Sequence, residues 1–446
     1  MIKPNNMEVI SSGYQDVKEY ICKNIPADIS SNILKHFYVF QKTDYGVLRF
    51  NTFTGEFVLL TENESLEAIN SISSHEYGFT ANKYVDDFRN KSLKVVDLAG
   101  HICTYTIFPT TGCNARCPYC FEKGRKISNM SQETANKVVN YISKHNGGNT
   151  VNIRWFGGEP LLRFDIIKFV CNSLRNLNVK FTSSMATNGL LLKDFDMAEL
   201  IAIMNLRQVQ ITIDGSEAVY NKVKGYISPT PNPFKQVLEN IRNLSISLKT
   251  DVLIRLNISA ANIDDLMVLL TSVLVPQFSS YKNIKVYTHL LNDSLSDLSQ
   301  DNTDILFLKW IELEKVIENT GLSTHIEMPS NVKTHRCIVD DGNAITVLPD
   351  GNIGLCENYT TNHYIGHINK EQFDKSEIQY LRTSSLHLDI CNSCVMYPQC
   401  IRLKCCPDAN YCSAQLRERQ IRNLQSSMLA AFQAFLSTGS KLRAKR

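Results

Sequence analysis

The distribution of its fourteen cysteines is the feature that most restricts the fold and chemistry of this 446-residue chain. Eleven of them form two groups, one at residues 113–120 and one between Cys337 and Cys412. The other three stand apart: Cys22, Cys103 and Cys171. A disulfide framework does not leave some 200 residues between two groups almost free of cysteine, whereas separate metal or redox sites do. The pattern therefore predicts such sites in a chain that stays in the reducing cytoplasm.

Composition and net charge restrict the kinds of partner that this chain is expected to bind. Hydrophobic residues make up 43% of the chain and the net charge is +3, and the only basic run is the tail at residues 441–446. Nucleic-acid and membrane-surface proteins normally concentrate basic residues on one face, so neither partner is expected. No apolar run approaches the roughly 18–20 residues that span a bilayer, and residues 1–20 do not resemble a secretory signal. The length predicts two to three domains.

Between residues 100 and 300, short β-branched runs alternate with helical patterns, which is typical of repeated βα units. The predicted strands are Ile102–Phe108, Val151–Trp155, Val179–Ala186, Val209–Asp214, Val252–Ile258 and Ile284–Leu290. Three helices are predicted. One begins after Ser131, a plausible N-cap, and the other two cover Pro233–Leu244 and Ile263–Leu274. Six units are fewer than the eight of a closed barrel, so we expect an α/β fold with a partial (β/α)6 TIM-like barrel. An open, doubly wound sheet is the alternative.

The segments on either side of the predicted barrel have different sequence patterns. Residues 1–95 predict a small α+β module, with a hairpin over Tyr45–Leu60 that turns at Thr54–Gly55 and a helix over Glu62–Ile72. From about residue 330 to 446, cysteines and turn residues dominate, and Ala414–Phe435 predicts a closing helix. We expect three domains, at residues 1–95, 100–300 and 330–446.

Cys113, Cys117 and Cys120 follow the first predicted strand of the barrel with the spacing C-x3-C-x2-C. Barrel sites lie at the carboxyl ends of the strands, which is where this loop falls. An electron-transfer iron–sulfur cluster takes four cysteines, so a compact trio leaves one iron open for another ligand. The alternative is a zinc site with a distant fourth ligand, although zinc sites usually combine two close pairs.

This loop resembles the defining motif of the radical S-adenosylmethionine (SAM) superfamily, and the resemblance extends over residues 100–290. Gly157, Gly158 and Glu159 resemble the family's GGEP turn, which contacts the methionyl amino group of SAM. Asn188 lies in a TNG element that reaches the ribose in the family. Further residues assigned to the cofactor site are Tyr119, Asp214 in the fourth-strand motif, and Arg255, whose guanidinium suits a carboxylate.

The resemblance implies a 4Fe–4S cluster that reduces SAM to a 5′-deoxyadenosyl radical, and this radical abstracts a substrate hydrogen. An electron donor such as flavodoxin or ferredoxin is then required. The protein's own task is to orient and shield the reactants, since the cofactor carries the difficult step.

The second cysteine group resembles the SPASM extension of radical SAM enzymes, with Cys391, Cys394 and Cys400 in the spacing C-x2-C-x5-C. The resemblance implies two auxiliary 4Fe–4S clusters. One takes Cys391, Cys394, Cys400 and Cys412, and the other takes Cys337, Cys356 and Cys406, or Cys405 in its place. A substrate thiolate, His335, His363 or water are the options for the open iron of the latter cluster. A structural zinc ribbon is the alternative for the whole group. Glu357, next to Cys356, resembles the position of an acidic proton acceptor and is the candidate catalytic residue.

SPASM enzymes act on peptides or proteins, and the module at residues 1–95 weakly resembles leader-peptide recognition elements, which pair a peptide with a sheet edge. A packing cap on the barrel is the other interpretation of that module. The preferred function is therefore a maturase that crosslinks a ribosomally synthesised precursor peptide through a thioether or carbon–carbon bond. The alternatives are sulfatase-maturase-like oxidation of a protein Cys or Ser to formylglycine, and a poly-cluster electron carrier without a substrate. The sequence leaves the bond that is formed open.

Overall fold

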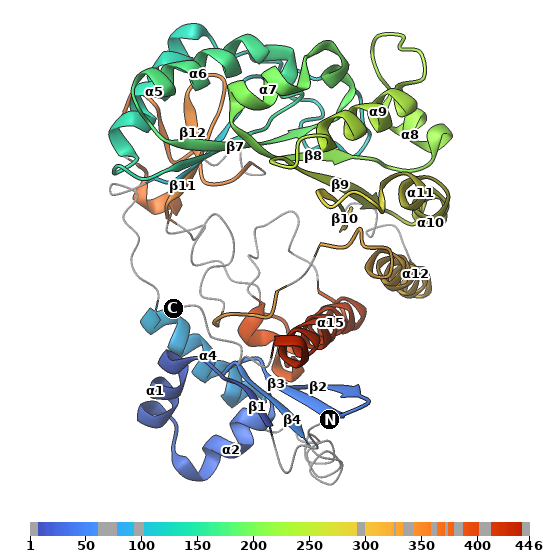
Figure 1. Cartoon of the computed structure of the whole chain (residues 1–446). Helices are drawn as coiled ribbons and strands as arrows, with labels where there is room; N and C mark the ends of the chain where they lie inside the picture. Colours follow the sequence, from blue (N-terminus) through green and yellow to red (C-terminus); the bar gives the residue numbers. More distant parts are fainter. Residues whose placement is uncertain are drawn as a thin grey trace. The chain divides into compact units, whose positions relative to one another are not determined.

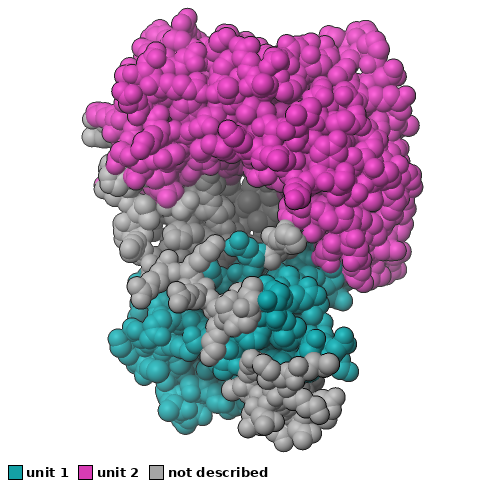
Figure 2. Space-filling view, in the orientation of Figure 1, with its two compact units in different colours: residues 1–95, 325–336, 384–446 teal, residues 96–324, 337–383 magenta. Residues whose placement is uncertain are grey.

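A computed structural model describes residues 8–60, 78–92, 102–291, 299–324, 327–332, 342–357, 364–370, 373–378, 387–400 and 412–438. The chain folds into two compact units (Figure 2). Unit 1 comprises residues 1–95, 325–336 and 384–446, and unit 2 comprises residues 96–324 and 337–383. The chain therefore crosses from one unit to the other four times.

Unit 2 is built on a nine-stranded sheet with the order β10-β9-β8-β7-β6-β5-β11-β12-β13 (Figure 1). Strands β5 to β10 are parallel neighbours in chain order, as βα units require. They are β5 (Thr104–Ile107), β6 (Val151–Trp155), β7 (Phe181–Thr187), β8 (Leu206–Thr212), β9 (Asp251–Ile258) and β10 (Ile284–Leu290). These six strands are the predicted ones, with ends that differ by at most three residues. The predicted α/β class and radical-SAM-like partial barrel are confirmed.

Helices connect these strands and, in Figure 1, α5, α6 and α7 run along one face of the sheet. The helices are α5 (Gln132–His145), α6 (Phe164–Asn176), α7 (Met197–Met204), α8 (Glu217–Lys224), α9 (Pro233–Ser245), α10 (Ile263–Leu269), α11 (Val275–Phe278) and α12 (Gln300–Glu318). Ser131 caps α5 as predicted, since its hydroxyl accepts a hydrogen bond from the Thr134 amide at 3.0 Å. The helix predicted over Ile263–Leu274 is α10 continued by a π-helical turn at Leu270–Leu274.

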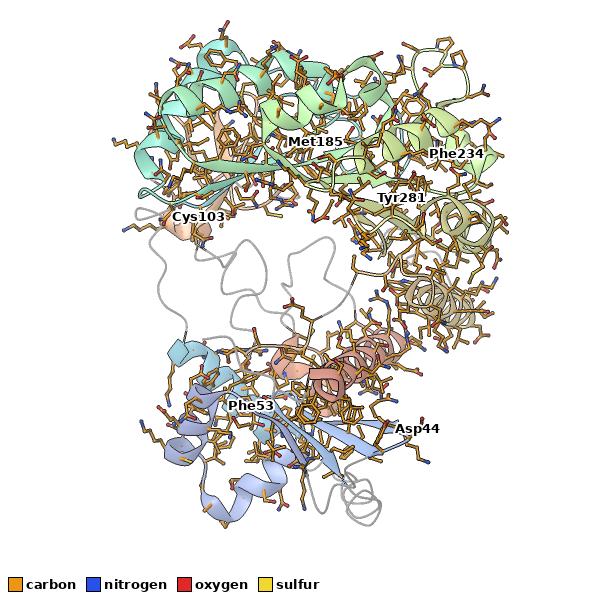
Figure 3. The ribbon with its side chains drawn as sticks, viewed as in Figure 1. Asp44, Phe53, Cys103, Met185, Phe234 and Tyr281 are labelled. Carbon is orange, nitrogen blue, oxygen red and sulfur yellow. The ribbon has the colours of Figure 1, made fainter. Side chains whose placement is uncertain are left out.

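Buried apolar and partly exposed polar side chains alternate along these strands, because one face of the sheet is covered by helices and the other face is polar. In β9, Val252, Ile254 and Leu256 are fully buried, while Arg255 between them is only partly buried. In β6, the fully buried Ile153 and Trp155 flank the partly exposed Arg154. The apolar side chains fill the layer between sheet and helices (Figure 3), to which Met185 of β7 and Phe234 of α9 belong. The polar face is therefore the one available for chemistry.

Three further strands extend this sheet. They come from residues 344–367, which were predicted to belong to the cysteine-rich C-terminal domain. Strand β11 (Ala344–Val347) pairs in parallel with β5, and β12 (Asn352–Gly354) and β13 (Gly366–His367) follow antiparallel. A turn joins β11 to β12. Residues 337–383 thus group with the barrel, while residues 384–446 group with the N-terminal segment. The expected functional division into three domains stays a prediction.

Unit 1 contains a four-stranded antiparallel sheet with the order β1-β4-β3-β2. Its strands are β1 (Glu8–Ser12), β2 (Tyr38–Thr43), β3 (Gly46–Asn51) and β4 (Glu56–Leu60). The predicted hairpin is β3–β4, whose turn ends at Gly55 with φ +70°, a value that favours glycine. The helix predicted over Glu62–Ile72 lies outside the described residues.

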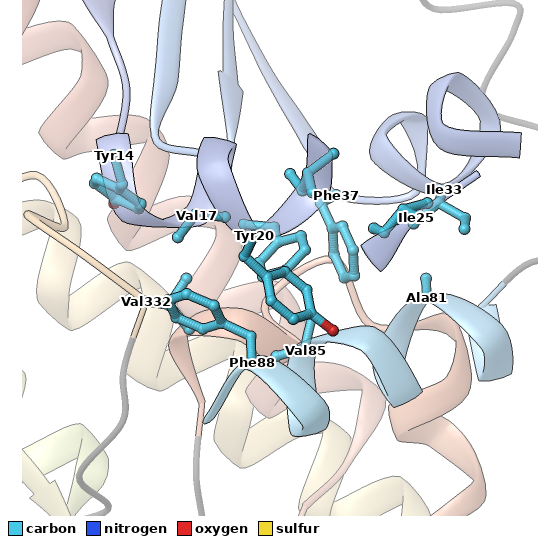
Figure 4. Packing of buried hydrophobic residues seen from close by; sticks show 12 residues of the cluster. Tyr14, Val17, Tyr20, Ile25, Ile33, Phe37, Ala81, Val85, Phe88 and Val332 are labelled. Atoms are coloured by element: carbon cyan, nitrogen blue, oxygen red, sulfur yellow. The ribbon is translucent and has the colours of Figure 1, made fainter. Parts of the chain in front are cut away.

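Two apolar clusters hold unit 1 together. In the first, Tyr20, Phe37 and Phe88 pack between helices α1 (Gln15–Asn24), α2 (Ala27–Lys35) and α4 (Gly78–Ser92) (Figure 4). In the second, α15 (Ala414–Thr438), the predicted closing helix, packs Met428 and Phe432 on the sheet beside Leu48, Phe50 and Phe57. Segments from both ends of the sequence therefore share one core.

Among the helices that the structure describes, none combines the length and apolar character needed to cross a bilayer.

Candidate cluster and cofactor site

The three cysteines of the predicted trio lie on one loop at the carboxyl end of β5. Side chains of Cys113, Cys117 and Cys120 are all partly exposed. The loop is held at its start, where the Thr111 amide donates to the Ser128 carbonyl at 2.9 Å, and at its end, where the Cys120 amide donates to the Cys117 carbonyl at 3.2 Å. The structure therefore brings the trio together at the sheet edge where barrel sites are built.

The glycine pair after β6 packs directly against this cysteine loop. The Gly158 amide donates to the Thr110 carbonyl at 3.1 Å, and the Glu159 amide donates to the Gly112 carbonyl at 2.8 Å. A Cβ on Gly158 would lie 2.1 Å from the Gly112 oxygen, and Gly157 adopts φ +115°. The sequence suggested that these glycines admit a ligand; the structure gives a second reason for them, which is close contact with the loop backbone.

Glu159 connects the glycine turn to the element after β7. Its carboxylate is fully buried and accepts hydrogen bonds from the Thr187 hydroxyl at 2.8 Å and the Asn188 amide at 2.9 Å. The Asn188 side chain in turn donates to the Asn114 side-chain oxygen at 2.6 Å, inside the cysteine loop. Burial raises the pKa of Glu159, and these hydrogen bonds oppose the rise. Two of the predicted cofactor residues, Glu159 and Asn188, are thus brought to the loop.

Asp214, at the carboxyl end of β8, is the centre of a second network. The Tyr119 hydroxyl donates to Asp214 Oδ1 at 2.6 Å, and Asn257 Nδ2 donates to the same oxygen at 3.1 Å. The Lys224 ammonium lies 2.8 Å from Asp214 Oδ2. Arg255 joins through its Nε, which donates to Asn257 Oδ1 at 2.8 Å. Tyr119, Asp214 and Arg255 were predicted as separate cofactor contacts, and the structure joins them in one chain of hydrogen bonds.

Further polar side chains line the same face of the sheet. The Tyr287 hydroxyl donates to Gln210 Oε1 at 2.6 Å, and burial raises the pKa of Tyr287. Glu357, the candidate catalytic residue, pairs with Arg154 of β6 at 3.3 Å. Neighbouring Cys356 contacts the Glu357 carboxylate through its sulfur at 3.8 Å. The structure thus places Glu357 beside the polar face of the sheet, and its catalytic role stays a prediction.

The thiols of the trio are held in their protonated form when no metal is bound. Burial raises the pKa of Cys113 to about 11, and burial likewise raises the pKa of Cys117 and of Cys120. The charge of Lys224 acts in the opposite direction on Cys117 and Cys120. Since iron binds the thiolate, loading of this site must release protons.

Three cysteine thiols on one loop are a donor set that iron–sulfur clusters use. Within the described ranges, no three Cys, His, Asp or Glu side chains are arranged to hold one metal ion. In a cubane cluster each thiolate binds a different iron, so the sulfur atoms lie farther apart than around one tetrahedral zinc. Three thiols on a loop backed by a buried cation fit a 4Fe–4S cluster.

Four cysteines of the C-terminal group are brought together in unit 1. Cys391, Cys394, Cys400 and Cys412 line one cavity with Tyr397 and Arg417. Burial raises the pKa of Cys394 to about 12. The backbone around the cavity is supported by α4, because Asn82 Nδ2 donates to the Cys391 carbonyl at 2.7 Å and Arg89 donates to the Tyr397 carbonyl at 2.6 Å. These four cysteines are the set predicted to share one auxiliary cluster.

Several predicted ligands lie outside the described residues: Cys337, Cys405, Cys406, His335 and His363. No disulfide is formed among the cysteines that the structure describes.

Sequence reasoning missed three residues of the site. Thr187 and Asn114 complete the Glu159 network, and their only signal was that Thr187 begins the TNG element and Asn114 lies between Cys113 and Cys117. Lys224 had no signal, because a lysine at the end of an amphipathic helix normally lies in solvent. Its side chain is only 3% exposed.

Residues 107–269 match the family model of the Radical SAM superfamily, and this range includes the three-cysteine loop and five of the six parallel strands in whole or in part. Among curated proteins, the chain is 29% identical to an uncharacterized protein of Methanocaldococcus jannaschii, over 31% of this chain and 46% of that one. It is 34% identical to a probable GTP 3′,8-cyclase of Methanococcus aeolicus, over 26% of this chain and 39% of that one. The chain thus spans less than half the length of these relatives.

Among solved structures, anSMEcpe with bound AdoMet matches with a TM-score of 0.56 and 16% identity, over 75% of this chain and 99% of that one. The same protein with bound AdoMet and the Cp18Cys peptide matches with a TM-score of 0.55 and 15% identity, over 75% and 99%. At this identity the likeness establishes a shared fold. The match of residues 107–269 to this superfamily implies a 4Fe–4S cluster and SAM as cofactors.

Proposed function

We propose that this protein is a radical SAM enzyme that modifies a ribosomally synthesised precursor peptide. The observation that carries the proposal is the convergence of two buried polar networks, centred on Glu159 and Asp214, on one three-cysteine loop. A loop with a purely structural metal has no need of the paired networks that the family uses to hold SAM.

When bound, the cluster and SAM supply a 5′-deoxyadenosyl radical that abstracts a hydrogen atom from the substrate. Cys113, Cys117 and Cys120 are the proposed ligands, and Tyr119, Asn188, Asp214 and Arg255 are the proposed SAM contacts, together with the turn at residues 157–159. Their task is orientation. Each polar side chain of the two networks is held by at least one other, which fixes its rotamer before a ligand arrives. Glu357 is the proposed proton acceptor.

The second group of cysteines supports an auxiliary-cluster domain of the SPASM kind. Cys391, Cys394, Cys400 and Cys412 line a single cavity, which suits one four-ligand cluster. Cys337, Cys356 and Cys406 are the proposed ligands of the other. A separate poly-cluster electron carrier is disfavoured, because it needs no SAM site.

The peptide substrate is supported by fold and by arrangement. The solved relative anSMEcpe, which shares this fold, has been captured with AdoMet and a peptide. The chain also supplies an antiparallel sheet in unit 1 whose strand β1 pairs with β4 on one side only among the described strands. An edge strand of this kind suits recognition of an extended leader peptide. We include a cytoplasmic location and a flavodoxin- or ferredoxin-like electron donor in the proposal, because thiolate ligands and a low-potential electron both require reducing conditions.

The radical step is tested by anaerobic reconstitution with iron and sulfide, followed by SAM and dithionite. We expect 5′-deoxyadenosine from the native chain and none from a C113A/C117A/C120A variant. A C391A/C394A variant is the matched control, since it should keep SAM cleavage while it loses iron. Absence of 5′-deoxyadenosine from the native chain would refute the proposal.

The substrate is tested with the peptide encoded by a short reading frame beside the gene. A crosslink removes two hydrogen atoms from that peptide, which mass spectrometry detects directly. An aldehyde that reacts with a hydrazide reagent would instead favour oxidation to formylglycine. An unchanged mass would point to epimerisation or to a different substrate.

A further inference from the structure

A buried cation lies behind the cysteine loop. Lys224 is the last residue of α8, and the helix ends there because Gly225 adopts the left-handed conformation at φ +50°. The side chains of Lys224 and Asp214 are 3% and 1% exposed, and their charged atoms lie 2.8 Å apart. A lysine is almost never buried this completely unless an anion accompanies it. Asp214 fulfils that requirement here.

The segment that carries Lys224 is fastened to the loop that carries the cysteines. The Arg116 amide donates to the Lys224 carbonyl at 2.8 Å, and the Ile227 amide donates to the Asn114 carbonyl at 2.9 Å. Asn114 and Arg116 both lie between Cys113 and Cys117. Lys224 is therefore fixed relative to the thiols by backbone hydrogen bonds on both sides, and its position does not depend on its flexible side chain alone.

The ammonium of Lys224 lies beside the cysteine loop, because it shares the Asp214 carboxylate with the hydroxyl of Tyr119, a residue between Cys117 and Cys120. The Asp214 carboxylate is screened by hydrogen bonds from Tyr119 and Asn257 at 2.6 and 3.1 Å. Burial opposes the charge on Lys224, but Asp214 and the neighbouring Tyr119, Cys117 and Tyr220 together raise the pKa of Lys224 above its ordinary range, so the ammonium stays charged.

We propose that Lys224 sets the reduction potential of the cluster on Cys113, Cys117 and Cys120, an inference that rests on the proposed function. Addition of one electron makes a cluster with thiolate ligands more negative. A fixed positive charge in a dry, low-dielectric environment stabilises that reduced state over the oxidised one. Lys224 thus acts as a positioning residue that makes the cluster easier to reduce by the electron donor.

The test is a potentiometric titration of the reconstituted full chain, followed by electron paramagnetic resonance. The signal of this cluster is the one that a C113A/C117A/C120A variant lacks. In K224M the equilibrium constant for reduction should fall at least tenfold, which is a potential about 59 mV lower for a one-electron couple. K224R keeps the charge and should stay within threefold of the native chain.

A second variant covers the case in which K224M does not fold with Asp214 left unpaired. K224M/D214N removes both charges together, and its equilibrium constant should lie between those of the native chain and K224M. If either methionine variant binds native amounts of iron and shows the native potential, the inference is overturned. If the native chain forms no cluster on the trio, the proposed function fails instead, so the two failures are distinguishable.

Discussion

Replacement of Gly158 by alanine tests whether the glycine turn supports the cysteine loop. The new Cβ would lie 2.1 Å from the Gly112 carbonyl oxygen and 2.7 Å from the Thr111 oxygen, both backbone atoms. Real Cβ atoms come no nearer than about 3.0 Å to such atoms. The loop around Gly112 must therefore move by about 0.9 Å, the difference between 3.0 and 2.1 Å. Gly158 does not adopt the left-handed conformation, so the effect is steric alone.

This displacement has two measurable consequences. Overpacking of this kind costs about 1–3 kcal/mol of unfolding free energy. A misplacement near 1 Å at a reacting site costs on the order of 100-fold in rate. We expect G158A to show that loss in SAM cleavage, and a reduced iron content at the trio after reconstitution. The assays are 5′-deoxyadenosine formation, iron per chain and denaturant unfolding.

Gly112→Ala is the matched control, because it lies in the same loop and has a different environment. Its Cβ would meet only side-chain atoms, Thr110 Oγ1 at 3.1 Å and Ile127 Cγ2 at 3.2 Å, and the Ile127 side chain is exposed. The exposed Ile127 side chain can give way by a few tenths of an ångström, whereas the buried Thr110 must shift slightly, so G112A should lose far less than G158A and cleave SAM within tenfold of the native rate. If G158A cleaves SAM and binds iron as well as G112A does, the reasoning from loop contact is wrong.

Three further predictions concern charge and thiols. D214N leaves the buried Lys224 without its anion, so it should lower the free energy of unfolding, measured with denaturant, by about 3–5 kcal/mol. K224M/D214N should recover most of that loss. Equal losses in the two variants would refute the pairing. Burial raises the pKa of Cys171 from 9.0 to about 12. Its thiol therefore stays protonated in the folded chain while the unfolded chain ionises, so stability that is present below pH 9 is lost as the pH rises, by up to about 1.4 kcal/mol per pH unit. Unfolding of C171V, measured from pH 8 to 10.5, should lack that component; identical slopes would contradict it. C405S and C406S should differ, with about four irons lost from C406S alone; equal iron contents would reject Cys406 as the ligand.

The six central strands were predictable because each is a short β-branched run between turn residues, and the partial barrel followed from their number. Ser131 and the β3–β4 hairpin were likewise local signals, carried by a capping hydroxyl and a turn glycine. The pairing of β11 with β5 was not predictable, because nothing near residues 344–347 encodes a parallel partner 240 residues earlier.

The cysteine spacing carries the proposed chemistry of the loop, whereas the side chains that support the loop were not all predictable. The motifs named Glu159, Asn188 and Asp214 as cofactor contacts, yet in the structure each also holds its neighbours in place. Lys224 shows the limit of sequence reasoning most clearly. Its burial depends on Asp214, which lies on a different element, and residue preferences place lysine at the surface.

The pairing of β5 with β11 also determines when β5 gains both of its neighbours in the sheet during synthesis. Thr104 aligns with Ala344, so β5 waits for 240 further residues before its second neighbour exists. At about 5–20 residues per second, that interval is about 12–48 seconds. Until then one edge of β5 has unpaired backbone groups, the kind of edge that attracts wrong partners. The cysteine loop follows this strand directly, and the Phe108 amide that begins the connection is bound by the Val347 carbonyl only after β11 arrives. Iron and sulfide that reached the growing chain before β11 was made would therefore meet a loop without this last hydrogen bond. Iron and sulfide that reached the released chain would meet the complete loop.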